Sequence, residues 1–192
     1  MTKGRLEAFS DGVIAIIITI MVLELKPPHG ADLGVLRDLA PVLGSYVLSF
    51  IYVGIYWNNH HHLFHAAQKV DGAVLWANLH LLFWLSLTPV ASAWMGENCF
   101  TTWPVAVYGA VLFGAGAAYY ILVRALIHRH GKGSALARAV GDDLKGKVSV
   151  AIYAAAIALA FWLPSASLAL YALVAAIWLV PDRRMEKAVG EH

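Results

Sequence analysis

The stretch from Phe9 to Leu25, FSDGVIAIIITIMVLEL, decides the fold of this chain. It is almost entirely apolar, and a helix needs about 20 mainly apolar residues to cross the hydrocarbon core of a bilayer. Later stretches of the same character are Leu39–Leu63, Ala73–Met95, Trp103–Ile127, Val148–Leu163 and Ser165–Val180. We therefore predict an all-α membrane protein with six transmembrane helices, forming a single domain over residues 1–192.

The last two predicted spans are short and lie close together. Only Pro164 separates Val148–Leu163 from Ser165–Val180, and proline inside a helix removes a backbone hydrogen bond. The two spans are expected to form a helical hairpin. One long kinked span, with a total of five, is the alternative.

The composition points to lipid as a partner. Hydrophobic residues make up 60% of the chain and charged residues only 14%, whereas about 25% of the residues of a soluble domain are charged. Too little polar surface remains to cover a water-facing globule, and the low charge also argues against disorder. The net charge of +2 and the lack of a basic stripe on any polar helix argue against a nucleic-acid partner.

The basic residues are divided unevenly between the two sides of the predicted bundle. With six spans, all 14 lysines and arginines except Lys26 and Arg37 fall on the side that holds both termini. Short loops rich in lysine and arginine stay in the cytoplasm. We therefore expect a multi-pass protein with both termini in the cytoplasm.

One face of the first span carries a distinctive row of side chains. At 100° per residue, an arc of about 100°, the width of one helix face, contains Gly12, Ile16, Thr19, Ile20 and Leu23. A lipid-facing helix has no reason to place Thr19 at mid-membrane. The alternative is that the threonine hydroxyl satisfies itself by bonding a carbonyl one turn back.

Two polar residues open the first span. An ionisable group such as Asp11 inside a span costs about 2.5–3.5 kcal/mol on insertion scales, so by default it faces a partner or water. Arg5, six positions earlier, is a candidate partner. Alternatively, Ser10 or Asp11 caps the helix start by accepting from backbone N–H groups. The residues alone leave both interpretations open.

The pattern Arg5-x-x-x-Phe9-Ser10-Asp11, followed by an apolar helix with a mid-span threonine, resembles the R-x-x-x-F-S-D signature of the transmembrane protein 175 family. That family contains potassium-selective channels of endosomes and lysosomes, with shorter six-helix prokaryotic relatives. Its second span ends in a tryptophan followed by histidines, and its third span carries an early asparagine. These features are matched here by Trp57, His60, His61 and Asn78.

The resemblance implies a homotetramer in the plasma membrane of a prokaryote, with one first helix from each subunit lining a central pore. Potassium is then the permeant ion, and no cofactor, metal or catalytic residue is implied. The family pattern places the hydrophobic constriction at Ile16, a polar ring at Thr19 and a further apolar ring at Leu23, with Gly12 and Ile20 on the same pore face. The Thr-Val-Gly-Tyr-Gly filter is missing, so selection is expected from dehydration at Ile16 and from Thr19 oxygens.

The motif itself is expected to fasten the first helix, because buried polar groups need partners. Trp57 with His60 or His61 would reach the cytoplasmic end of the first helix. The expected network contains Arg5, Phe9, Ser10, Asp11, Trp57, His60, His61 and Asn78.

Two other classes of function compete with a channel. A proton- or cation-coupled secondary transporter would use Asp11 and the histidine cluster, but transporters usually show inverted repeats and helices broken near mid-membrane. A metal-dependent membrane enzyme would use His61, His65 and His80 as ligands, but their number and spacing fall short of known metal sites. We therefore expect a protein that is not an enzyme.

Overall fold

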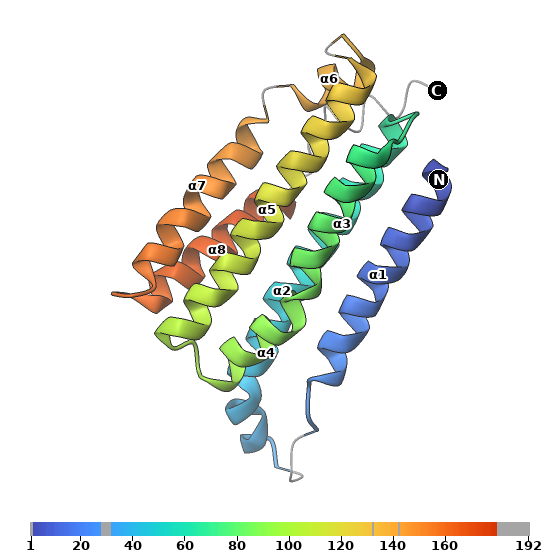
Figure 1. Cartoon of the computed structure of the whole chain (residues 1–192). Coiled ribbons are helices and arrows are strands. Elements are labelled where there is room, and N and C mark those ends of the chain that lie inside the picture. The colour runs from blue at the N-terminus through green and yellow to red at the C-terminus, as the bar shows by residue number, and fades with distance from the viewer. Residues whose placement is uncertain (1, 28–31, 132, 142, 180–192) are drawn as a thin grey trace.

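A computed structural model describes residues 2–27, 32–131, 133–141 and 143–179 of the chain, and within these ranges helices are the only regular secondary structure. The helices are α1 (Lys3–Leu23), α2 (Gly34–Ala66), α3 (Gly72–Ser86), α4 (Thr88–Glu97), α5 (Thr102–His130), α6 (Ala135–Val140), α7 (Leu144–Leu159) and α8 (Pro164–Leu179). The long helices run side by side as one bundle, with α1 at its edge (Figure 1). The prediction of an all-helical fold is confirmed.

Four segments of the described chain are long and apolar enough to cross a membrane: α1, α2, α3 with α4 taken together, and α5. Helices α7 and α8 have only 16 residues each, which corresponds to about 24 Å at 1.5 Å per residue. Val180, the predicted end of the last span, lies outside the described residues.

Helix α1 begins at Lys3, well before the predicted start at Phe9. Its first turns are stabilised by burial of Leu6 and by an ion pair between Lys3 and Glu7, with N and O 3.9 Å apart. Ser10 therefore lies about two turns inside the helix. The interpretation of Ser10 or Asp11 as an N-cap is wrong, because the capping position is Thr2.

The third predicted span, Ala73–Met95, is divided into two helices. Helix α3 ends at Ser86, and α4 starts at Thr88 with Pro89 in its first turn. Proline is tolerated there because the first N–H groups of a helix have no partner within the helix. The two pieces still follow one another through the bundle (Figure 1).

Helices α7 and α8 form the predicted hairpin, and the single kinked span is excluded. Ser167 donates a hydrogen bond to the Ala156 carbonyl at 2.8 Å, and the Trp178 indole donates to the Ser149 hydroxyl at 2.8 Å. These bonds join the start of α8 to the end of α7 and the end of α8 to the start of α7. The two helices are therefore antiparallel.

Polar contacts hold the loops at both ends of the bundle. At one end, the His130 imidazole at the end of α5 accepts from the backbone N–H groups of Gln68 and Lys69, and Arg129 pairs with Asp71 at 3.5 Å. The short helix α6 lies at this same end, which also holds the start of α1 (Figure 1). At the opposite end, Lys26 pairs with Glu97 at 3.5 Å.

Candidate functional site

Helix α1 has a buried side and an exposed side. The buried side, formed by Leu6, Ser10, Ile14, Ile17 and Met21, packs against α2, α3 and α4. The exposed side includes every residue of the predicted pore face, namely Gly12, Ile16, Thr19, Ile20 and Leu23. The Ile16 side chain is 59% exposed and that of Leu23 is 73% exposed. A row of large apolar side chains at the edge of the bundle is thus free to meet lipid or a second copy of the chain.

The Thr19 hydroxyl bonds a backbone carbonyl one turn back in α1, as the alternative interpretation proposed. Its hydroxyl donates to the Ala15 carbonyl at 2.9 Å. A hydroxyl has one hydrogen and two lone pairs, so this bond occupies the donor and leaves the oxygen as an acceptor on the exposed side. Self-satisfaction and a role as an oxygen ligand for a cation are therefore compatible.

A buried chain of hydrogen bonds fastens α1 to α2 and α3. The Asn78 amide donates to the Ser10 hydroxyl at 2.9 Å, and Ser10 donates to the Leu6 carbonyl at 2.9 Å. The other end of the Asn78 amide, its Oδ1, lies 2.8 Å from His60 Nε2. Because Asn78 Oδ1 can only accept, the His60 nitrogen that faces it carries the proton. Ser10, His60 and Asn78 are all buried.

A second connection joins α1 to α2 nearer the surface. The Trp57 indole donates to Asp11 Oδ1 at 3.0 Å. The His61 ring stacks on Trp57 with centroids 6.0 Å apart and an angle of 25° between the planes. The sequence left open whether His60 or His61 joins the network, and the structure divides the roles: His60 binds Asn78, and His61 supports Trp57.

Two residues of the predicted network lie outside it. Arg5 is exposed, and no ion pair joins it to Asp11 in the part of the chain that the structure describes. Phe9 is 48% exposed and lies seven positions before Ile16, hence on the same helix face. Unlike Ser10, Arg5 and Phe9 do not lie on the buried side of α1. Within one chain, the prediction that they fasten α1 to its neighbouring helices is therefore not met.

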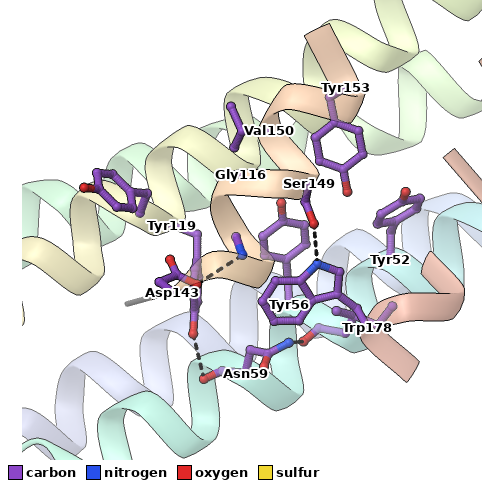
Figure 2. Close-up of a pocket in the computed structure, with 13 residues that line it drawn as sticks. Tyr52, Tyr56, Asn59, Gly116, Tyr119, Asp143, Ser149, Val150, Tyr153 and Trp178 are labelled. Carbon is purple, nitrogen blue, oxygen red and sulfur yellow. Dashed lines mark hydrogen bonds between the residues drawn. The ribbon is translucent and has the colours of Figure 1, made fainter. Parts of the chain in front are cut away.

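A cavity of about 40 Å³ lies between α2, α5, α7 and the end of α8. Figure 2 shows its tyrosine-rich wall, with Tyr52, Tyr56 and Tyr153 around it. Tyr119 donates to the Asn59 carbonyl at 3.2 Å. A volume of this size accommodates a few water molecules. Sequence reasoning missed the cavity because its tyrosines come from separate helices and show no motif.

The predicted metal ligands do not meet in one place. In the described segments, no group of three or more His, Cys, Asp or Glu residues is arranged to hold a metal ion. His80 instead accepts a hydrogen bond from the Trp84 indole at 3.0 Å. His61 and His65 remain neighbours on α2, with ring centroids 6.3 Å apart.

Comparison with known proteins shows which family this chain resembles. The model of the endosomal/lysosomal potassium channel TMEM175 family matches residues 5–89, which contain the α1 face and the network that fastens it. A protein named a potassium channel in Chryseobacterium sp. (strain P1-3) is 53% identical over 192 residues, covering 100% of both chains. The chain belongs to the TMEM175 family.

Other TMEM175 proteins extend the similarity to a solved structure and to animals. The crystal structure of a lysosomal potassium-selective channel TMEM175 homolog from Chamaesiphon minutus matches 95% of this chain and 97% of that chain, with a TM-score of 0.81 and 26% identity. The human protein named endosomal/lysosomal proton channel TMEM175 is 30% identical over 128 residues, which are 64% of this chain and 24% of that protein. The TMEM175 fold is thus shared along nearly the whole chain.

Proposed function

We propose that this protein is a potassium channel whose ion path is lined by the exposed face of α1. The observation that carries the proposal is the division of α1 into two sides. One side is fixed to α2 and α3 through Ser10 and Asp11, while Ile16, Thr19 and Leu23 stay uncovered. The names of the bacterial relatives as potassium channels agree with this function.

A pore of this kind requires several copies of the chain. One helix cannot enclose a channel, and closed rings of identical subunits are the usual way to repeat it. We infer a homotetramer of one six-helix domain per subunit, residues 1–192, in the plasma membrane of a bacterium. The concentration of lysine and arginine near the start of α1, the α2–α3 loop and the α5–α7 segment supports cytoplasmic termini.

Ion selection follows from the order of side chains along the face. A ring of Ile16 side chains forms a hydrophobic constriction, which an ion crosses only by losing part of its hydration shell or after the constriction wets. Potassium holds its water less tightly than sodium, so this step favours potassium. Thr19 lies one turn further along with its oxygen unoccupied as an acceptor, and four such oxygens replace part of the lost water.

Proton conduction is a second candidate, because the human relative is named a proton channel. A coupled transporter has less support. Transporter sites are built where helices are interrupted near mid-membrane. The break in the third span lies between α3 and α4, whereas α1, the helix that carries Asp11, is continuous from Lys3 to Leu23. Asp11, the acid that a transporter would use, also accepts a hydrogen bond from the Trp57 indole.

Flux through purified protein in liposomes separates these functions. A channel selective for potassium gives a reversal potential that follows the potassium gradient when sodium replaces potassium outside. A proton channel gives a potential that follows the pH gradient instead, and a coupled carrier moves potassium only together with protons. The proposal fails if the potential follows the pH gradient or if no potassium current appears.

A further inference from the structure

Three aromatic rings form a column on the exposed side of α2 near its end. Trp57, His61 and His65 are spaced four residues apart, so they lie above one another on one helix face. The Trp57 and His61 centroids are 6.0 Å apart, and those of His61 and His65 are 6.3 Å apart. Both histidines are exposed, and α2 ends at Ala66, so water reaches the pair from that end of the bundle.

The ring nitrogens of this pair are unoccupied, unlike those of several other histidines. His60 bonds Asn78, His80 accepts from Trp84, and His130 accepts from two backbone N–H groups. In the segments that the structure describes, no hydrogen bond or ion pair engages His61 or His65. Two free imidazoles one turn apart on a helix have the spacing of the two histidine ligands in helical zinc motifs.

We propose that His61 and His65 form a binding site for a divalent transition-metal ion such as Zn²⁺, Ni²⁺ or Cu²⁺. Neutral imidazole suits these ions. The described residues supply no third His, Cys, Asp or Glu, so water completes the coordination and the ion exchanges with solvent. The stack of Trp57 on His61 restricts the imidazole to one side of the helix and reduces the ordering that binding requires.

The site lies next to the attachment of α1. Trp57 contacts His61 on one side and donates to Asp11 on the other. A bound ion would therefore restrict the motion of Trp57, His61 and His65 next to the hydrogen bond that joins α2 to α1. The binding step itself does not depend on the proposed potassium conduction and is measurable without any flux.

Titration of purified, tag-free protein with Ni²⁺ tests the site by calorimetry. The wild type should bind one ion per chain at this site. His61→Gln and His65→Gln should each lower the affinity by about tenfold or more, because loss of either ligand converts a chelate into a single-ligand site. The double variant should bind more weakly than either single variant, because it keeps neither imidazole ligand. His128→Gln, on the exposed end of α5, is the matched control and should bind like the wild type.

Two results would overturn the site. One is wild-type affinity in either single variant, and the other is an equal loss of affinity in His128→Gln. A measurement on the unaltered protein covers the case in which a variant misfolds. Electron paramagnetic resonance of Cu²⁺-loaded wild type should show coupling to two imidazole nitrogens, and coupling to none or one would contradict the proposal.

Discussion

Neighbouring isoleucines on α1 face opposite ways. Ile17 is 3% exposed and packs inside the bundle, while Ile16 is 59% exposed. The same alternation separates Ser10, which is buried with Asn78, from Phe9, which lies on the Ile16 side. Each residue's surroundings therefore depend on which of two helix faces it occupies, and a change of one position moves a side chain from the buried side to the exposed side that we propose lines the ion path.

Replacement of Ile16 by alanine should raise the conductance and weaken the preference for potassium. The smaller side chain widens the constriction, so an ion loses less of its hydration shell on passing. The measurement is the current and reversal potential in bilayers with potassium on one side and sodium on the other. Val22→Ala is the control, because Val22 is also apolar and exposed but lies on another face of α1. Unchanged currents and reversal potentials for Ile16→Ala would contradict the assignment.

Replacement of Asp11 by alanine should reduce assembly more than it alters permeation. The change leaves the Trp57 N–H without its acceptor and removes one connection between α1 and α2. The yield of assembled protein, followed by size-exclusion chromatography in detergent, should fall, and Asp11→Asn should fall less because it keeps an acceptor oxygen. A well-folded tetramer with normal currents in Asp11→Ala would count against this role.

Removal of the Asn78 side chain should destabilise the fold. Asn78→Ala leaves the facing groups of Ser10 and His60 unpaired in a buried site, and each such loss costs about 1–3 kcal/mol. Thermal unfolding in detergent measures the effect. Asn98→Ala is the control, because Asn98 is exposed and its side-chain amide donates to the Trp94 carbonyl of its own turn, not to another helix. Equal unfolding temperatures for the two variants would show that the buried network contributes little.

At the scale of helices, small residues on α5 set the packing distances. A side chain at Gly114 would overlap the Trp84 ring of α3, and one at Gly109 would overlap Tyr171 of α8. Glycine at these two positions lets α5 approach its neighbours closely. Gly116 on the same helix is different, because a Cβ there would meet Val150 at an ordinary 3.4 Å.

Gly114 and Gly116 therefore provide a matched pair of variants. Gly114→Ala should lower the free energy of unfolding by about 1–3 kcal/mol, since overpacking a close helix contact forces backbone or ring shifts. Gly116→Ala should be tolerated. Thermal unfolding of both variants in one detergent measures the difference. A destabilisation of Gly116→Ala equal to that of Gly114→Ala would refute the packing explanation.

The sequence predicted helices and faces better than it predicted their ends. Hydropathy located the helices, and the 100° period separated the two sides of α1. The hydropathy pattern placed the start of α1 at Phe9, because Glu7 and Arg5 are polar. The ion pair between Lys3 and Glu7 and the burial of Leu6 extend the helix to Lys3. Helix ends depend on such tertiary contacts, which a hydropathy pattern does not contain.

Part of the candidate site was predictable from the sequence, and part depends on tertiary contacts. Ser10, Asp11 and Asn78 were predicted as anchors because buried polar groups need partners, and the hydrogen bonds join each of them to a neighbouring helix. Arg5 was included as a candidate partner of Asp11 and as part of the family signature, but its side chain is exposed in the structure of a single chain. The tyrosine-lined cavity was missed, since it forms only when α2, α5, α7 and α8 come together.

At the scale of the whole molecule, the bundle is asymmetric. α1 is packed against α2, α3 and α4, and its remaining surface is the row of exposed apolar side chains that includes Ile16, Ile20 and Leu23. Assembly of four copies around this row would cover it and create a single ion path. In the proposed function, the fold of one chain supplies the lining and the oligomer supplies the pore.

The most direct test asks whether neighbouring positions on α1 differ in their access to the ion path. Cys99, the single cysteine of the chain, is first replaced by serine, and Leu23→Cys and Val22→Cys are made separately in that background. Both side chains are exposed, but only Leu23 lies on the Ile16 face. A charged methanethiosulfonate reagent added from water should block potassium current through Leu23→Cys and leave Val22→Cys unaffected. Equal block of both variants, or block of Val22→Cys alone, would contradict the assignment of the α1 face to the pore.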